Sequence, residues 1–288
     1  MIRLATRSSA QARTQAEVVA QSITSATGLP VELVFVETLG DQNKDQPLHQ
    51  IGGQGIFVKE VQQAVLRGDA DIAVHSAKDL PSQHAEGLVI GAWCERRDAR
   101  DALVGRSLSD LELGATVATG SVRRRAQLLT VRPDLQFVEL RGNIHTRLEK
   151  IPDNGSIVMA IAAMQVLGIT DRIAEELVTT DFVPMVGQGC VAVECREGDS
   201  NTLAAVSSID HARTRFAVEI ERAFLAELGA GCSMPVGAYV NESNVLSTFM
   251  ATGATNSDRH VKFVETVPPV DAHEFARELA RKSQSALA

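Results

Sequence analysis

The stretch Asp71-Ile-Ala-Val-His-Ser-Ala-Lys-Asp-Leu-Pro81 is the most informative single stretch of the sequence. Its apolar first half is typical of a short buried strand, which ends directly in Ser76, Lys78 and Asp79. Ligands of open α/β sheets bind at the carboxyl ends of strands, so these three side chains are candidates for a binding site. Asp79 could stabilise a positive charge that develops during a reaction. A turn ion pair between Lys78 and Asp79 is the alternative without a function.

Strands and helices alternate on both sides of this stretch. A strand over 2–6 is expected to lead into a helix to about residue 26, capped by Ser8 or Ser9, and a strand over 31–37 follows. A second series has strands over 116–119, 136–140 and 156–161, with helices over about 122–130 and 143–150. The polar segment 39–55 reads as a loop. This alternation predicts two α/β lobes, each with a largely parallel sheet.

The last part of the chain has a different pattern. A strand over 191–196 and a long amphipathic helix over 211–228 precede three alternating strands near 236–240, 245–251 and 260–267. A helix over about 272–286 ends the series. Several strands between two helices predict a third, smaller α+β domain.

Five arginines gather in two short stretches of a chain whose net charge is −8. Three of them follow Thr119-Gly-Ser121, and Arg141 and Arg147 lie in Leu140-Arg-Gly-Asn-Ile-His-Thr-Arg-Leu148. Arginine matches carboxylate or phosphate oxygens two at a time, and a helix that starts at Ser121 adds backbone N–H groups. The pattern therefore predicts an anion site, with a solvated basic helix face as the alternative. Three consecutive arginines cannot all point the same way on a helix, so at least one is expected to face solvent.

Composition excludes several classes of function. The chain has 288 residues, 44% apolar and 22% charged, which is ordinary for two or three globular domains. Its acidic balance argues against nonspecific binding to nucleic acid or to anionic membranes. The start lacks the apolar core of a signal peptide and no run is long enough to span a membrane, so we expect a cytoplasmic protein.

The four cysteines show no paired metal spacing, so no metal site is predicted. Cys232 lies between a glycine and a serine after the long helix. It is either a buried structural thiol or an exposed nucleophile or attachment point.

Taken together, these stretches resemble the porphobilinogen deaminase family, also called hydroxymethylbilane synthases. The resemblance also rests on the motifs Leu4-Ala-Thr-Arg-Ser-Ser9, Gly52-Gly-Gln-Gly-Ile-Phe-Val-Lys-Glu60, Val186-Gly-Gln-Gly189 and Gly231-Cys-Ser-Met-Pro-Val-Gly237. All of these motifs occur in the family's order and are spread over nearly the whole chain. The resemblance implies two periplasmic-binding-protein-like lobes with a third, smaller α+β domain. The first lobe would comprise 1–94 plus 190–208, the second 95–189, and the C-terminal domain with the cofactor cysteine 209–288.

The resemblance also implies a transferase. Four porphobilinogen molecules would condense head to tail with loss of ammonia, giving hydroxymethylbilane on a dipyrromethane bound covalently through Cys232. A monomer without nucleic-acid or membrane partners is expected. The implied catalytic residues are Asp79, Lys78 and Arg7. The implied cofactor-binding residues are Cys232, Ser9, Ser76, Lys78, Asp79, Thr119, Ser121, Arg123, Arg124 and Gln188. Arg7, Arg141 and Arg147 would bind substrate carboxylates, since every pyrrole unit carries an acetate and a propionate.

The sequence departs from the family pattern around these residues. Family members commonly have an arginine where Val166 stands, lysines at the positions of Gln50 and Gln54, and an arginine at Leu39. The loss of these cationic positions predicts weaker substrate binding. Two alternatives stay open: a two-lobed binding protein for a small carboxylate, and a deaminase homologue with reduced or lost activity.

Overall fold

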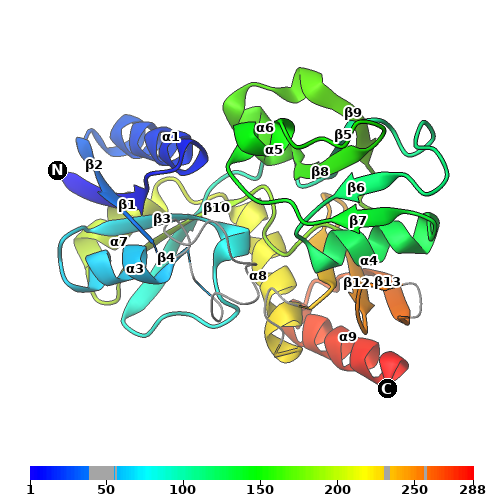
Figure 1. The fold of residues 1–288 in the computed structure, drawn as a ribbon. Helices are drawn as coiled ribbons and strands as arrows, with labels where there is room; N and C mark the ends of the chain where they lie inside the picture. The colour runs from blue at the N-terminus through cyan, green and yellow to red at the C-terminus, as the bar shows by residue number, and fades with distance from the viewer. Residues whose placement is uncertain (39–54, 56, 230–233, 256–257) are drawn as a thin grey trace. The chain divides into compact units, whose positions relative to one another are not determined.

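The computed structural model describes residues 1–38, 55, 57–229, 234–255 and 258–288 (Figure 1). Within this part the chain divides into two compact units, residues 1–97 with 189–216 and residues 98–188 with 217–288. Most of the predicted loop 39–55 lies outside the described residues, as do Leu39, Gln50, Gln54 and Cys232. The finer division into three domains at the predicted boundaries stays a prediction.

The first lobe is built on a five-stranded sheet in the order β2-β1-β3-β10-β4. β10 runs antiparallel to both of its neighbours, whereas β1 pairs in parallel with β2 and β3. The elements are β1 (Ile2–Arg7), α1 (Ala10–Thr27), β2 (Val31–Val36), α3 (Lys59–Leu66), β3 (Ile72–Ser76), the 3-10 turn η1 (Ala77–Asp79), β4 (Leu88–Trp93), β10 (Val191–Arg196) and α7 (Ser200–Ser207).

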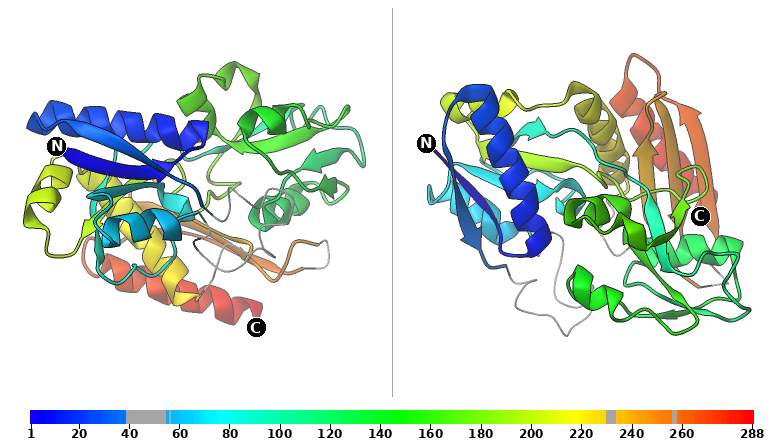
Figure 2. Two further views of the ribbon diagram at one scale, coloured as in Figure 1. Left: turned by 60° about the vertical axis from the view of Figure 1, so that its left-hand side comes forward. Right: turned by 90° about the horizontal axis from the view of Figure 1, so that it is seen from above.

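Alternation along the strands decides which helix covers which face of this sheet. Leu4 of β1 packs in one apolar cluster with residues of α1 and α7, and the next residue, Ala5, packs in another with residues of α3. Successive strand residues point to opposite faces, so α1 and α7 cover one face and α3 the other. Both views in Figure 2 show α1 lying along the strands that it covers. Ser9 caps α1 by accepting a hydrogen bond from the Ala12 amide, as the sequence predicts.

The second lobe repeats the plan with the order β7-β6-β8-β5-β9. Here β5 is the antiparallel strand, between β8 and β9. The elements are β5 (Asp101–Gly105), β6 (Thr116–Ala118), α4 (Val122–Val131), β7 (Gln136–Val138), α5 (Ile144–Leu148), β8 (Ser156–Ala160), α6 (Ile161–Leu167), η2 (Thr170–Arg172) and β9 (Ile173–Leu177). The prediction of a largely parallel sheet therefore needs one correction in each lobe. β10 and β5 are each the first strand after the chain passes from one unit to the other.

The rest of the chain forms the predicted α+β part. After α8 (Ala212–Glu227), the strands β11 (Val236–Val240), β12 (Val245–Ala251) and β13 (His260–Thr266) make an antiparallel sheet in chain order, and α9 (Ala272–Leu287) follows. The three sheets confirm the predicted α/β class with a smaller third part. In the described portion of the chain, no helix has both the length and the apolar character needed to cross a membrane.

Candidate functional site

A pocket of about 50 Å³ lies at the carboxyl ends of β1 and β3 in the first lobe. β1 ends at Arg7 and β3 at Ser76, and because the two strands are parallel their ends meet at one edge of the sheet. The pocket is lined by the predicted residues Arg7, Ser9, Ser76 and Asp79, together with Gln11, Ala12, Gln15, Phe57, Val58, Val74 and His75. Four of the predicted site residues are thus brought together, although they come from two separate stretches of sequence.

Local contacts fix the side chains around this pocket. The guanidinium carbon of Arg7 lies 4.1 Å from the centroid of the Phe57 ring, a cation–π arrangement. The Ser76 hydroxyl donates to Oε1 of Gln15 at 3.1 Å. Lys78 and Asp79, both partly buried, form the short turn η1 directly after β3. Gln15 and Phe57 were not predicted as site residues, although Phe57 lies in the 52–60 motif that carries the resemblance.

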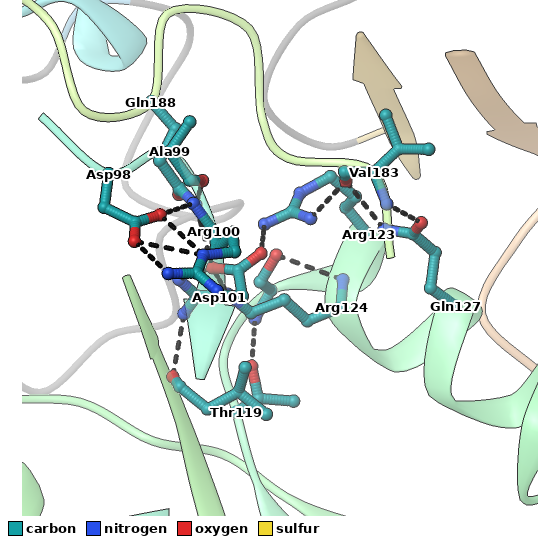
Figure 3. A network of polar contacts seen from close by, with 12 residues as sticks. Asp98, Ala99, Arg100, Asp101, Thr119, Arg123, Arg124, Gln127, Val183 and Gln188 are labelled. Carbon is teal, nitrogen blue, oxygen red and sulfur yellow. Dashed lines mark hydrogen bonds and ion pairs between the residues drawn. The ribbon is translucent and has the colours of Figure 1, made fainter. Parts of the chain in front are cut away.

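The second lobe holds a buried network centred on Asp101, the first residue of β5 (Figure 3). Nη2 of Arg123 lies 2.7 Å from Oδ2 of Asp101, and Nη2 of Arg124 lies 2.7 Å from Oδ1. Gln188 donates from Nε2 to Oδ1 of Asp101 at 3.0 Å and to the carbonyl oxygen of Ala99 at 2.8 Å. Asp101 is fully buried, and Arg123 and Arg124 are 4% and 9% exposed. The structure therefore brings together three predicted residues and adds a carboxylate that the sequence analysis missed.

Backbone groups hold the other ends of the two guanidiniums. Arg123 donates to the carbonyl oxygen of Val183 at 2.7 Å, and Arg124 donates to that of Val158 at 2.8 Å. Ser121 caps α4 by accepting a hydrogen bond from the Arg124 amide, and its own amide donates to the Thr119 hydroxyl. This local geometry places Thr119 and Ser121 beside the start of the helix that carries the arginines. Arg125, next in sequence, is exposed and lies over the Phe137 ring, which confirms the prediction that one of the three faces solvent.

The charges of this network do not cancel. Burial of Asp101 opposes its ionised form, but attraction by Arg123 and Arg124 outweighs burial and holds its pKa well below the ordinary range. Burial lowers the pKa of Arg123, and Asp101 counteracts it. Arginine stays protonated in proteins, so two guanidinium charges face one carboxylate charge and one positive charge is left over. An excess positive charge in a buried site favours an anionic ligand.

Arg141 precedes the short helix α5, and Arg147 lies in its last turn. Arg141 is partly buried, and its Nη1 is buried with no hydrogen-bond partner in the described part of the chain. Arg147 donates from Nε to the carbonyl oxygen of Gly142 at 2.8 Å, and Asn143 caps α5. Gly142 has a φ of 113°, which side-chain-bearing residues rarely adopt, so glycine is needed at this turn. The orphaned guanidinium nitrogen of Arg141 is a donor suited to a ligand carboxylate.

Asp101→Ala is expected to lower the free energy of unfolding by about 3 to 5 kcal/mol, because it leaves two buried guanidiniums without their counter-charge. Glu274→Ala is the matched control, since Glu274 pairs with Arg277 and Arg281 at the surface of the same unit and should cost less than about 1 kcal/mol. Chemical denaturation measures both values. An Asp101→Ala variant no less stable than the control would contradict the ion-pair account.

The stabilisation by Asp101 should also depend on pH in a defined direction. The folded pKa of Asp101 is depressed, so its contribution is fully present above the ordinary aspartate pKa of about 4 and is lost as the pH falls below it. Denaturation at several acidic pH values should therefore bring the wild-type stability toward that of Asp101→Ala. A stability difference between the two proteins that does not change with acidification would contradict this.

Comparisons with known proteins show which family models and relatives the chain matches. The family model "Porphobilinogen deaminase, dipyromethane cofactor binding domain" matches residues 2–204, and "Porphobilinogen deaminase, C-terminal domain" matches residues 215–282. The protein named porphobilinogen deaminase in Thermobifida fusca (strain YX) is 42% identical over 291 residues, covering 97% of this chain and 91% of the relative. The protein of that name in Syntrophotalea carbinolica is 46% identical over 244 residues, covering 83% of this chain and 78% of the relative.

The solved structures that align with this chain are more distant. The methionine-binding protein MetQ aligns with a TM-score of 0.47 and 16% identity, covering 72% of this chain and 89% of that chain. A periplasmic substrate-binding protein of an ABC transporter from Coxiella burnetii aligns with a TM-score of 0.46 and 16% identity, covering 74% of this chain and 94% of that chain.

Proposed function

The chain belongs to the porphobilinogen deaminase family, and on that premise we propose that its first-lobe pocket and its buried arginines bind the carboxylates of porphobilinogen and of the growing pyrrole chain. The activity is that of a transferase of porphyrin and heme biosynthesis, which condenses four porphobilinogen molecules head to tail, with loss of ammonia, to hydroxymethylbilane. Its cofactor is dipyrromethane. The family, the activity and the cofactor were predicted from the sequence and are confirmed.

The proposal that the arginines bind carboxylates rests on two buried guanidinium nitrogens. Nε of Arg123 and Nη1 of Arg141 are buried and have no hydrogen-bond partner among the residues that the structure describes. A buried donor left without an acceptor costs about 1 to 3 kcal/mol, and more when it is charged. A ligand rich in carboxylates would remove that cost and balance the excess charge beside Asp101. Porphobilinogen and dipyrromethane, with an acetate and a propionate on each ring, have the chemistry that these donors require.

Each predicted residue has a role in this scheme. When bound, dipyrromethane supplies the pyrrole carbon to which the first porphobilinogen is joined. Cys232 would hold it through a thioether, and this attachment stays a prediction because Cys232 lies outside the described residues. The residues that would orient the cofactor carboxylates and ring N–H groups are Ser9, Ser76, Lys78, Thr119, Ser121, Arg123, Arg124 and Gln188. Arg7, Arg141 and Arg147 would bind the carboxylates of incoming porphobilinogen.

Asp79 would act on the reacting substrate. It lines the first-lobe pocket beside Arg7 and Ser76, at the point where β3 ends. Departure of ammonia leaves a positive charge spread over the pyrrole ring of the substrate. A carboxylate placed to face that charge stabilises it as it develops, and this is the role that we assign to Asp79.

Ammonia release separates this function from the binding-protein alternative. Purified protein given porphobilinogen should release one ammonia for each porphobilinogen consumed and form hydroxymethylbilane. A two-lobed binding protein would take up the compound and release no ammonia. Saturable binding of porphobilinogen without ammonia release would therefore favour the alternative. The monomeric state, the absence of nucleic-acid and membrane partners, and the cytoplasmic location stay predictions.

Val166→Arg is expected to lower the KM for porphobilinogen by about ten- to 150-fold, since a charge-assisted hydrogen bond contributes roughly 1.5 to 3 kcal/mol. Val166 is half-buried near the end of α6, and the apolar cluster that contains Met164 and Leu167 does not include it. An arginine there can therefore reach solvent or ligand without entering the core.

Steady-state kinetics of Val166→Arg and of the control Val166→Ala measure this effect. The control should change little, and a thermal melt should show that both variants are folded. A folded Val166→Arg protein with unchanged KM and kcat would mean that the missing arginine is no functional loss here.

A further inference from the structure

A buried carboxylate lies behind the first-lobe pocket. Glu194 of β10 is 2% exposed. Nε2 of Gln62, from α3, donates to both of its oxygens, at 3.1 Å and 2.9 Å. Two hydrogen bonds from one amide group leave both oxygens as acceptors, which is the pattern of an ionised carboxylate. The roles assigned above to the pocket residues do not involve Glu194.

His75 of β3 is in contact with this carboxylate. Its Nε2 lies 3.1 Å from Oε2 of Glu194, and the two side chains are 2% and 3% exposed. The ring nitrogen has no well-aligned hydrogen bond, and the contact is an ion pair when the imidazole is protonated. Burial opposes ionisation of Glu194, but the contact with His75 and the hydrogen bonds from Gln62 outweigh it and hold the pKa of Glu194 below its ordinary value.

One member of the pair formed by His75 and Glu194 lines the pocket. His75 lines the first-lobe pocket, whereas Glu194, which contacts the His75 ring, does not. We propose that His75 forms a positively charged floor of this pocket, that it meets a carboxylate of porphobilinogen or of the bound pyrrole chain, and that Glu194 is the positioning residue that keeps it charged and oriented. This inference rests on the function proposed above and adds a contact to it.

Charge balance supports the assignment. An ionised carboxylate removed from water is strongly unfavourable unless a counter-charge accompanies it. His75, in contact, and His84, from a greater distance, are basic groups whose charges favour the ionised form of Glu194. On the pocket side, His75 shares the lining with Arg7 and Asp79. A charged His75 would add to the attraction of Arg7 for a ligand carboxylate and would offset the repulsion by Asp79.

Nitrogen NMR of histidine tests the charge without using turnover. Protein labelled with ¹⁵N-histidine is examined at pH 8, and the His75 signals are assigned through His75→Gln. We expect imidazolium shifts for His75 in the wild-type protein and a neutral ring in Glu194→Gln. Glu197→Gln, an exposed change of the same kind just after β10, is the matched control and should leave the His75 signals unchanged. A neutral His75 in the wild-type protein at pH 8 overturns the proposal even if Glu194→Gln does not fold.

Kinetics then tests the contact with the ligand. Glu194→Gln should raise the KM for porphobilinogen about tenfold, with a smaller change in kcat, because a charge-assisted hydrogen bond is replaced by a neutral one. Glu194→Asp should restore part of the binding, since it returns the charge. Equal KM values for wild type and a folded Glu194→Gln overturn the proposed contact. If the proposed function itself failed, the wild-type protein would release no ammonia, and this outcome is distinct from failure of the His75 contact.

Discussion

Cys232→Ser is expected to give a folded protein with no measurable turnover of porphobilinogen and almost no bound dipyrromethane. The thiolate of a cysteine is a strong nucleophile near neutral pH, whereas a serine hydroxyl needs an activating base. The change replaces one atom, so the fold should survive. Intact mass spectrometry and an assay for ammonia release measure the two effects.

The other cysteines are poor candidates for the attachment. Burial, with a smaller contribution from Asp210, raises the pKa of the Cys94 thiol to about 12, and burial also raises that of Cys195. Cys190 is 2% exposed. Cys94→Ser is therefore the matched control and should keep both cofactor and activity. Normal turnover and a normal adduct in Cys232→Ser would contradict the assignment of the cofactor cysteine.

Asp79→Asn is expected to keep the fold and most of the cofactor while slowing elongation about 100- to 1000-fold. Removal of one group that stabilises developing charge typically has an effect of this size. Asparagine keeps the shape of the side chain and one of its two acceptor oxygens, and it removes the negative charge. Single-turnover release of ammonia from a stoichiometric amount of porphobilinogen measures the rate constant.

Asp69→Asn serves as the control for Asp79→Asn. Asp69 is an exposed aspartate of the same lobe that pairs with Arg67, away from the pocket lining. Its replacement should leave the elongation rate unchanged. A decrease of less than about tenfold for Asp79→Asn, too small for such a stabilising group, would mean that Asp79 only shapes the turn after β3.

The helices that were predicted correctly have their start or stop signals in the residues at their own ends. Ser9 and Gly28 mark the two ends of α1, and Ser121 marks the start of α4, so both helices begin where the sequence predicts. α6 was not predicted, and its N-cap residue, Ala160, makes no side-chain cap. α3 begins at Lys59, after an N-cap valine that also lacks a side-chain capping bond. A helix end without a capping side chain lacks the residue pattern from which the sequence could predict it.

The parts of the site that were missed depend on strand order. The arginines beside Ser121 and the polar end of β3 were recognised as site residues from local patterns. The partner of those arginines, Asp101, begins β5, whose antiparallel place between β8 and β9 no local pattern indicates. Glu194 likewise meets Gln62, 132 residues away, only because β10 inserts between β3 and β4. A counter-charge on a strand from another part of the chain can be identified only once the pairing register of that strand is known.

The intact mass of the wild-type chain, purified from a host that makes porphobilinogen, shows whether the protein carries a covalent dipyrromethane. If the chain is a deaminase that carries its own primer, the mass should exceed that of the sequence by one dipyrromethane. Peptide mapping should place the increment on the fragment that contains Cys232. Addition of porphobilinogen should then give a ladder of further increments of one pyrrole unit each. An unmodified mass, or an adduct on Cys94, Cys190 or Cys195, would contradict the account.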